Sequence, residues 1–246
     1  MHQFFVEKSQ VGKEYVTITG SDVNHIRNVL RMKIGETICI SDREGGNYFC
    51  KIAETGENFV QADIVSVDEE GTELPSKIYL FQALPKGDRM ETVIEKAVEL
   101  GVYEIIPVAM KYCVVKLEGK KAAQRVQKWQ AQAETAAKQS KRSIIPKIHE
   151  VVSFKEALKL AENCDIRLVP YENENGMEGT RTVLEQIEPG KSISIMIGPE
   201  GGFAEEEIAK ARETMQSISL GRRILRTDTA GICMMSMLML QLESRI

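Results

Sequence analysis

The chain reads Ser194-Ile195-Met196-Ile197-Gly198-Pro199-Glu200-Gly201-Gly202-Phe203 near its C-terminus, an apolar run that ends in a glycine-containing turn. Three glutamates at 205–207 follow, and they suit the positive N-terminal end of a helix. The same plan of strand, glycine turn and helix start returns over 218–231. Ligands favour the edge of an α/β sheet where strands end in such turns, so the pair predicts a pocket built chiefly from backbone groups. The glutamates disfavour a phosphate there and favour a neutral or cationic ligand.

The region around these turns alternates strands with helices. Strands are predicted at 77–84, 105–108, 166–169, 193–197 and 218–220. Helices are predicted at 88–100, 119–140, 154–161, 183–187, 204–215 and 227–244, the last capped by Thr227. This alternation predicts an α/β fold with a mostly parallel sheet that is covered on both faces.

The first part of the chain has a different pattern, with short β-like runs at 15–18, 37–40, 48–52 and 59–64. One helix interrupts them. Ser21 and Asp22 can cap it, Ile26, Val29 and Leu30 form its apolar side, and Arg27 and Arg31 lie four residues apart on another. The sequence therefore predicts a small β-barrel over residues 1–70, an acidic linker over 71–76 and the α/β domain over 77–246.

Composition narrows the class of protein. The 246 residues are 43% hydrophobic and 28% charged, which is ordinary for a soluble globular protein. No run approaches the ~18 apolar residues of a membrane span, and the N-terminus lacks the features of a secretion signal. The five cysteines are scattered without a CxxC pair, which favours reduced thiols and a cytoplasmic location.

Several common catalytic sites are absent from the sequence, since it contains no GxGxxG, GxxxxGK[ST], GxSxG or HExxH. The three histidines, His2, His25 and His149, have no metal-ligand spacing, so no metal is expected. These absences speak against a serine, cysteine or metal hydrolase and against a phosphate-loop enzyme.

Charge is distributed unevenly. The formal net charge is −4, yet residues 111–147 hold ten Lys or Arg against two Glu. Such a basic stretch is either a surface that faces nucleic-acid phosphates or a solvated helix face. In the second glycine turn Arg222, Arg223 and Arg226 are placed to meet phosphates, and Ile224 and Leu225 to flank an aromatic base.

These two turns resemble the SPOUT methyltransferases. The similarity is carried by Ile-Gly-Pro-Glu-Gly-Gly-Phe at 197–203 and Leu-Gly-Arg-Arg-Ile-Leu-Arg-Thr-Asp-Thr-Ala at 220–230. It extends to blocks at 25–31, 86–91, 96–102 and 136–142, and is strongest with the bacterial family that methylates N3 of a uridine in 16S ribosomal RNA. Where that family usually has an arginine and a glutamate, this chain has Gln3 and Asp228.

The resemblance implies an N-terminal PUA-like β-barrel and a C-terminal SPOUT α/β domain with a deep trefoil knot. It also implies a homodimer, with S-adenosylmethionine bound by loops at 168–172, 197–202 and 220–230. The cofactor-binding residues that it implies are Leu168, Pro170, Tyr171, Glu172, Ile197, Gly198, Pro199, Gly201, Gly202, Leu220, Gly221, Ile224, Leu225, Thr227, Thr229 and Ala230.

The expected reaction is methyl transfer to uracil N3, with Arg226, Glu200 and Asp228 as the catalytic candidates. The candidate RNA-binding residues are Arg27, Arg31, Lys86, Lys138, Lys141, Arg142, Arg222 and Arg223. The expected RNA partner is 16S ribosomal RNA, naked or in the assembled small subunit. Three alternatives stay open: a SPOUT enzyme acting on transfer RNA or a ribose hydroxyl, a non-catalytic RNA-binding assembly factor, and an unrelated nucleotide-binding α/β enzyme.

Overall fold

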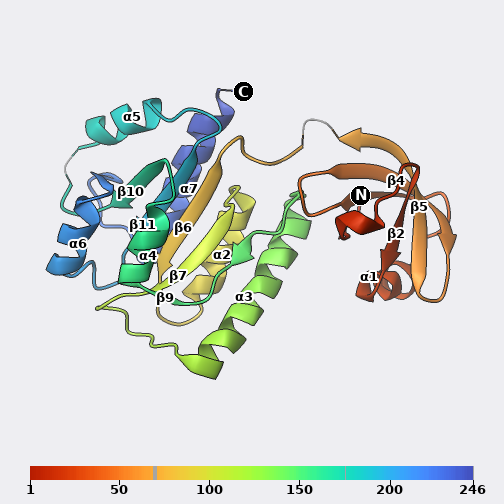
Figure 1. Cartoon of the computed structure of the whole chain (residues 1–246), viewed down its shortest axis with the longest axis horizontal. Helices are drawn as coiled ribbons and strands as arrows, with labels where there is room; N and C mark the ends of the chain where they lie inside the picture. The colour runs from red at the N-terminus through yellow and green to blue at the C-terminus, as the bar shows by residue number, and fades with distance from the viewer. Residues whose placement is uncertain (69–70, 175, 246) are drawn as a thin grey trace. The chain divides into compact units, whose positions relative to one another are not determined.

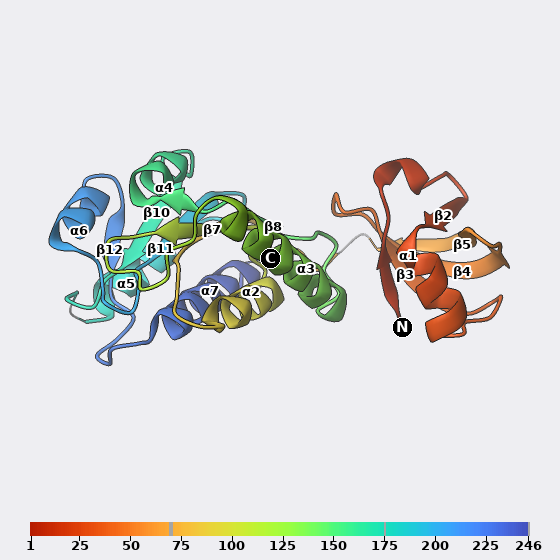
Figure 2. The ribbon, with the colours of Figure 1, turned by 90° about the horizontal axis from the view of Figure 1, so that it is seen from below.

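The structure is a computed structural model that describes residues 1–68, 71–174 and 176–245. It divides into two compact units. The first comprises Met1–Glu73 and Ala137–Ile145, and the second Leu74–Ala136 and Pro146–Ile246. Figures 1 and 2 show the elements of each unit.

The first unit is a five-stranded sheet with the order β1-β3-β4-β5-β2. Its elements are β1 (Gln3–Phe5), η1 (Lys8–Gln10), β2 (Tyr15–Thr19), α1 (Ser21–Asn24), η2 (His25–Val29), β3 (Thr37–Ser41), β4 (Asn47–Thr55) and β5 (Phe59–Asp68). Alternate strand residues such as Ile38, Ile40 and Val60 are fully buried and form one core with Ile26 of η2. The sheet is open in its described pairings, since β1 and β2 stand at its two edges.

The helix of the first unit differs from the prediction. α1 begins after Gly20 without a side-chain cap, and the chain then continues as the π-helical η2. Val29 is 64% exposed rather than part of the apolar side. Arg31 has a φ of 54°, so it lies beyond the helix and the expected four-residue spacing of Arg27 and Arg31 on one helix is wrong. The wider π turn changes which residues share a face.

The second unit is an α/β layer structure whose described strand pairings are all parallel. Its strands are β6 (Lys77–Ala83), β7 (Glu104–Ala109), β8 (Lys147–Ile148), β9 (Val152–Ser153), β10 (Ile166–Pro170), β11 (Ser192–Ile197) and β12 (Gln216–Ile218). They are ordered β12-β10-β11-β6-β7-β8, with β9 beside β7.

Helices cover both faces of this sheet, as predicted. They are α2 (Arg89–Glu99), α3 (Gly119–Gln139), α4 (Phe154–Ala161), α5 (Glu178–Glu185), α6 (Glu205–Arg212) and α7 (Thr227–Glu243). Figure 2 shows α4 on one side of the sheet and α2 and α7 on the other. α2 and α4 bury residues at helical spacing, and Ser153 with Glu156 forms a capping box at the start of α4.

Most boundaries of this unit agree with the sequence within a few residues. The exceptions are α5, which begins at Glu178 rather than 183, and the short strands β8 and β9, which were not predicted. The last strand is Gln216–Ile218 rather than 218–220, and α6 ends at Arg212 rather than 215. The expected cap of the last helix is also wrong. Arg226 occupies the N-cap position of α7 without a side-chain bond, and the Thr227 hydroxyl bonds elsewhere.

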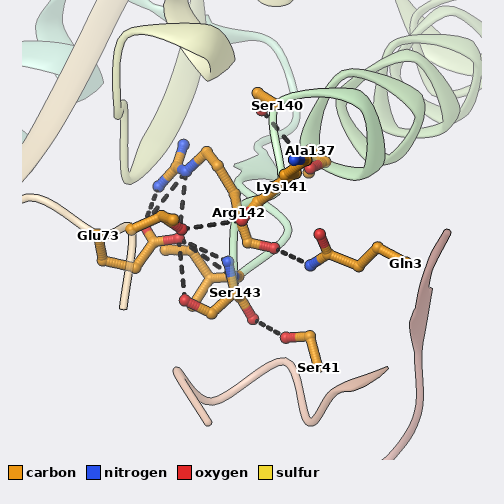
Figure 3. A network of polar contacts seen from close by, with 10 residues as sticks. Gln3, Ser41, Glu73, Ala137, Ser140, Lys141, Arg142 and Ser143 are labelled. Atoms are coloured by element: carbon orange, nitrogen blue, oxygen red, sulfur yellow. Dashed lines mark hydrogen bonds and ion pairs between the residues drawn. The ribbon is translucent and has the colours of Figure 1, made fainter. Parts of the chain in front are cut away.

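One segment joins the first unit although the sequence placed it with the second. Residues 137–145 are held there by hydrogen bonds that Figure 3 shows. The Arg142 guanidinium is 3% exposed and pairs with Glu73, whose carboxylate also accepts the Ser143 amide at 2.9 Å. Gln3 Nε2 donates to the Arg142 carbonyl at 2.7 Å, and the Ser41 hydroxyl donates to the Ser143 carbonyl. Glu73, expected in the linker, thus has a structural role.

Candidate functional site

The two glycine turns and a third loop meet at one edge of the second unit's sheet. The three loops follow β10, β11 and β12, which are neighbouring parallel strands, so their carboxyl ends lie at the same edge. Together they line a cavity of about 270 Å³ that is open to solvent on one side. Its lining residues are Pro170, Tyr171, Glu172, Ile197, Gly198, Pro199, Glu200, Gly202, Phe203, Leu220, Gly221, Arg222, Arg223, Ile224, Leu225, Arg226, Thr227 and Ala230.

Three residues expected to bind the cofactor lie outside this lining. Leu168 is fully buried in β10. Gly201 packs against Tyr112, because a Cβ at Gly201 would lie 3.0 Å from the Tyr112 Cβ. Thr229 is exposed on α7 and does not line the cavity. The other residues in that expected set do line it, as does Phe203, to which the sequence assigned no role.

Close packing explains two of the glycines. Gly202 has a φ of 72°, and a Cβ there would stand 2.8 Å from Glu172 Oε1. At Gly198 a Cβ would lie 2.8 Å from the ring of Phe203. The first glycine turn therefore folds back on itself, and the Glu172 carboxylate of the loop after β10 lies against the backbone of this turn.

Glu200 connects this turn by hydrogen bonds to the loop between β6 and α2 and to the first residue of α2. Its Oε1 accepts the backbone amide of Lys86 at 2.8 Å and the Arg89 guanidinium at 3.0 Å. The carboxylate side chain is 25% exposed. Since two donors share this oxygen, the structure gives Glu200 a positioning role in the loop. Arg89 lies within the block 86–91 that carries the resemblance, but it was not itself a candidate site residue.

The loop after β12 presents charged and apolar side chains at the cavity. Arg222, Arg223 and Arg226 all line it and are exposed, and Ile224 is 88% exposed. Asp228 differs from them: it does not line the cavity, and its Oδ1 is enclosed without a hydrogen-bond partner among the described residues. Its carboxylate stands in the first turn of α7, where it complements the helix dipole.

Loop 110–114 borders the same edge and is anchored to the start of α6. The Lys111 amide donates to Glu207 at 2.9 Å and its Nζ pairs with Glu206 at 2.7 Å. The hydrogen bond from Lys111 lowers the pKa of Glu206, and the same bond raises the pKa of Lys111. Burial raises the pKa of the nearby Cys113 thiol. Tyr112, 47% exposed, is thereby held against Gly201.

The RNA-binding candidates of the first unit differ in their exposure. Arg27, Arg31 and Lys141 are exposed, and Lys138 lies 3.6 Å from Asp22. Arg142 is buried and its guanidinium is paired with Glu73, so it is unavailable to a phosphate, and we withdraw it as an RNA-binding candidate. Gln3 bonds to the backbone of this same segment.

Within 1–68, 71–174 and 176–245 no cluster of three or more His, Cys, Asp or Glu is arranged to hold a metal ion. None of the helices described has the length and apolar character needed to cross a membrane. The five cysteines are free, and Cys50, Cys113 and Cys164 are buried.

Comparison with known proteins bears on this geometry. Residues 72–239 match the model of an RNA methyltransferase domain, and residues 18–65 that of an RNA methyltransferase PUA domain. The chain is 35% identical to ribosomal RNA small subunit methyltransferase E of Bacillus subtilis, over 99% of this chain and 98% of that protein.

Two solved structures of similar proteins contain a cofactor. One is a ribosomal RNA small subunit methyltransferase E from Neisseria gonorrhoeae bound to S-adenosylmethionine, with a TM-score of 0.81, 32% identity and coverage of 96% of this chain and 95% of that chain. The other, a putative methyltransferase from Legionella pneumophila with the same cofactor, has a TM-score of 0.81, 30% identity and coverage of 97% and 96%.

Proposed function

The chain belongs to the RNA methyltransferase family, and on that premise we propose that it transfers a methyl group from S-adenosylmethionine to N3 of a uridine in 16S ribosomal RNA. The observation that carries the proposal is the cavity between the loops after β10, β11 and β12. Similar proteins that hold S-adenosylmethionine share this fold over nearly the whole chain.

The residues around the cavity suit this cofactor. Ile197, Leu220 and Leu225 offer apolar contacts for an adenine ring, and Gly198 and Gly202 present backbone without side chains at the cavity wall. The carboxylates of Glu172 and Glu200 favour the positive charges of a sulfonium and an ammonium group.

Arg226 has the direct role in the chemistry. When bound, S-adenosylmethionine supplies an electrophilic methyl group on a sulfonium. Uracil N3 carries a proton and the neutral imide is a poor nucleophile, so negative charge must be stabilised on the ring oxygens as that proton leaves. The exposed guanidinium of Arg226 lines the cavity and supplies such a donor. Glu200 accepts hydrogen bonds that hold its loop in place. We assign no proton transfer to Asp228, because its Oδ1 is enclosed and the residue does not line the cavity.

We assign RNA recognition to basic side chains of both units. In the second unit these are Lys86, Arg222 and Arg223, which lie on the loops at the cavity edge. In the first unit they are Arg27, Arg31, Lys138 and Lys141. Phosphate contacts of this kind position an RNA, whereas stacking and base-edge contacts identify the nucleotide.

Two further parts of the proposal concern the chain's topology and assembly. We propose that the loop before α7 is tied in a trefoil knot; in support, α7 follows the edge strand β12 yet packs against the central strands β6 and β11. We also propose a homodimer, because α7 exposes Leu240 at 69% beside a hollow of about 480 Å³ that Met177, Leu184 and Met237 help to line.

Methyl transfer from labelled cofactor tests the function. Intact small subunits, naked 16S RNA and transfer RNA are compared, and the labelled nucleoside is identified by mass and mapped. Label in N3-methyluridine of 16S RNA supports the proposal. Label in transfer RNA or at a ribose hydroxyl would show another enzyme of this fold, and a protein that binds RNA without binding the cofactor would be an assembly factor. Sedimentation of the same preparation tests the dimer.

A further inference from the structure

Gln82 is a polar residue at the centre of the second unit's sheet. It lies near the end of β6, the strand between β11 and β7, and it is fully buried. In the register of the sheet it stands opposite Ile197, the residue directly before Gly198. It does not line the cavity. No role is expected for it from the sequence, where it is one residue of the strand predicted at 77–84.

The Gln82 amide begins a short chain of hydrogen bonds that ends in the cofactor loop. Its Nε2 donates to Thr227 Oγ1 at 2.9 Å, and Thr227 Oγ1 donates to the Gly198 carbonyl at 2.6 Å. A hydroxyl has a single proton, so a Thr227 that donates to Gly198 can only accept from Gln82. The amide therefore fixes the direction in which the hydroxyl points.

This chain joins two of the three loops around the cavity. Thr227 is the first residue of α7 and ends the loop after β12, whereas Gly198 begins the loop after β11. The peptide that follows Gly198 has no N–H because Pro199 supplies its nitrogen. The Gly198 carbonyl is thus the one group through which hydrogen bonding can orient that peptide.

The other contacts of the Gln82 amide are weaker, since Nε2 also donates to the Ala83 carbonyl, but at the longer distance of 3.3 Å. Its Oε1 is buried and has no hydrogen-bond partner among the described residues. That oxygen lies 3.0 Å from the place where a Cβ on Gly231 would stand, so it faces the backbone of α7. A buried acceptor without a partner costs stability, and an apolar residue of similar size would avoid that cost. Stability alone therefore does not account for a glutamine here.

We propose that Gln82 is a positioning residue of the cofactor pocket, acting through Thr227 to fix the Gly198 carbonyl and the spacing of the two loops. The inference rests on the proposed function in that it takes the occupant to be S-adenosylmethionine. Gln82 does not itself line the cavity, and its side-chain amide reaches the pocket through its hydrogen bond to Thr227, which does.

Four variants test this role by calorimetry with S-adenosylmethionine. Gln82→Leu removes the amide, Thr227→Val removes the hydroxyl at constant shape, Thr227→Ser restores the hydroxyl, and Ser194→Ala is the control. Ser194 is another fully buried polar residue, on β11, and its hydroxyl bonds to Ile166 away from the loops. Gln82→Leu and Thr227→Val should each raise the dissociation constant about tenfold, the scale of one hydrogen bond.

The remaining expectations separate positioning from mere stability. Thr227→Ser should restore affinity, Ser194→Ala should leave it unchanged, and the double variant Gln82→Leu/Thr227→Val should bind no worse than Thr227→Val alone. The melting temperature of Gln82→Leu should be unchanged or higher. A lower melting temperature with unchanged affinity would overturn the proposal, as would additive losses in the double variant.

A second readout needs no cofactor. Hydrogen exchange of the unliganded protein should be faster across 199–203 and 220–226 in Gln82→Leu than in wild type, and unchanged there in Ser194→Ala. If wild type fails to bind S-adenosylmethionine, the proposed function fails, and the exchange result still decides the role of Gln82. If wild type binds and Gln82→Leu matches it in both affinity and exchange, the positioning role is wrong.

Discussion

Arg226 lines the cavity and is exposed, as Arg222 and Arg223 are, and it stands directly before α7. Replacing it by alanine should lower turnover by ~10²–10³, the effect of removing one donor to a developing oxyanion, while cofactor affinity changes little. Single-turnover methylation of saturating RNA and calorimetry with S-adenosylmethionine measure the two quantities. Arg222→Ala is the matched control, because Arg222 lines the same cavity and is assigned to phosphate contact. Turnover of Arg226→Ala equal to that of the control would contradict the assignment.

At the level of single residues, the sequence indicated which side chains could cap a helix or carry charge, but it did not indicate their hydrogen-bond or ion-pair partners. Thr227 is a residue type that often caps helices, yet its hydroxyl donates to the carbonyl of Gly198, which is 29 residues away. Arg142 is one of a run of basic residues, but its charge is matched by Glu73, 69 residues earlier. Periodicity and local propensity describe neighbours in the chain, so bonds across such separations could not be foreseen.

In the turn between β3 and β4, one carboxylate accepts hydrogen bonds from both a side chain and the backbone. Asp42 has a fully buried side chain that pairs with Lys8 and accepts the amides of Glu44 at 3.0 Å and Gly46 at 2.8 Å. Desolvation by burial raises the pKa of Asp42, but the hydrogen bonds from Lys8 and from these amides outweigh it, so the net pKa is lowered. The same carboxylate raises the pKa of Lys8.

Asp42→Asn should therefore lower the stability of the first unit in a pH-dependent way. The amide keeps the backbone bonds and loses the charge pair, a loss of about 1–3 kcal/mol near neutral pH. Because the folded pKa is depressed, the carboxylate stabilises the fold above its unfolded pKa of about 3.9, and that stabilisation is lost as pH falls through the folded pKa. Urea unfolding of the full chain from pH 7 downward should show the gap between wild type and variant closing below about pH 4. A gap independent of pH would contradict this, and Glu57→Gln, on the surface of the same unit, controls for lost charge.

Elements with long apolar periodicity were the ones that the sequence predicted well. α4 agrees at both ends and α2 within a residue. Ser153 caps the start of α4, and Gly101 follows the end of α2. β8 and β9 have two residues each, too short for a period-2 pattern to be read. β1 was missed for the same reason, and it pairs in parallel with β3, whose partner residues are 36 positions away.

On the scale of the whole molecule, the α/β layer and the small β domain could be predicted from patterns, whereas the activity came from resemblance. Backbone loops with glycines and exposed arginines predict a pocket near nucleic acid but do not distinguish a methyl donor from another cation. The division into units was also beyond the sequence, since residues 137–145 pack with a β domain that precedes them by more than sixty residues. Their bonds to Gln3, Ser41 and Glu73 supply the physical reason.

The first unit should provide RNA affinity that is independent of the cofactor. Arg27 and Arg31 are exposed, and the Arg27 guanidinium donates to the Glu57 carbonyl at 3.1 Å, which holds it at the surface. Charge reversal of both to glutamate should weaken RNA binding and make it less dependent on salt, because fewer counterions are released from the phosphates. Cofactor affinity should not change, since both residues belong to the first unit and the cavity to the second.

A matched control separates a docking surface from net charge. Lys13 and Lys51 are also exposed on the first unit, and reversing both changes the net charge by the same amount. Binding of the small-subunit RNA is measured for both double variants over a range of salt concentrations, with calorimetry for the cofactor. Weaker binding in Arg27→Glu/Arg31→Glu alone supports a docking surface at these arginines. Equal losses in both would mean that overall charge carries the affinity, and unchanged binding would leave RNA recognition to the arginines at the cavity.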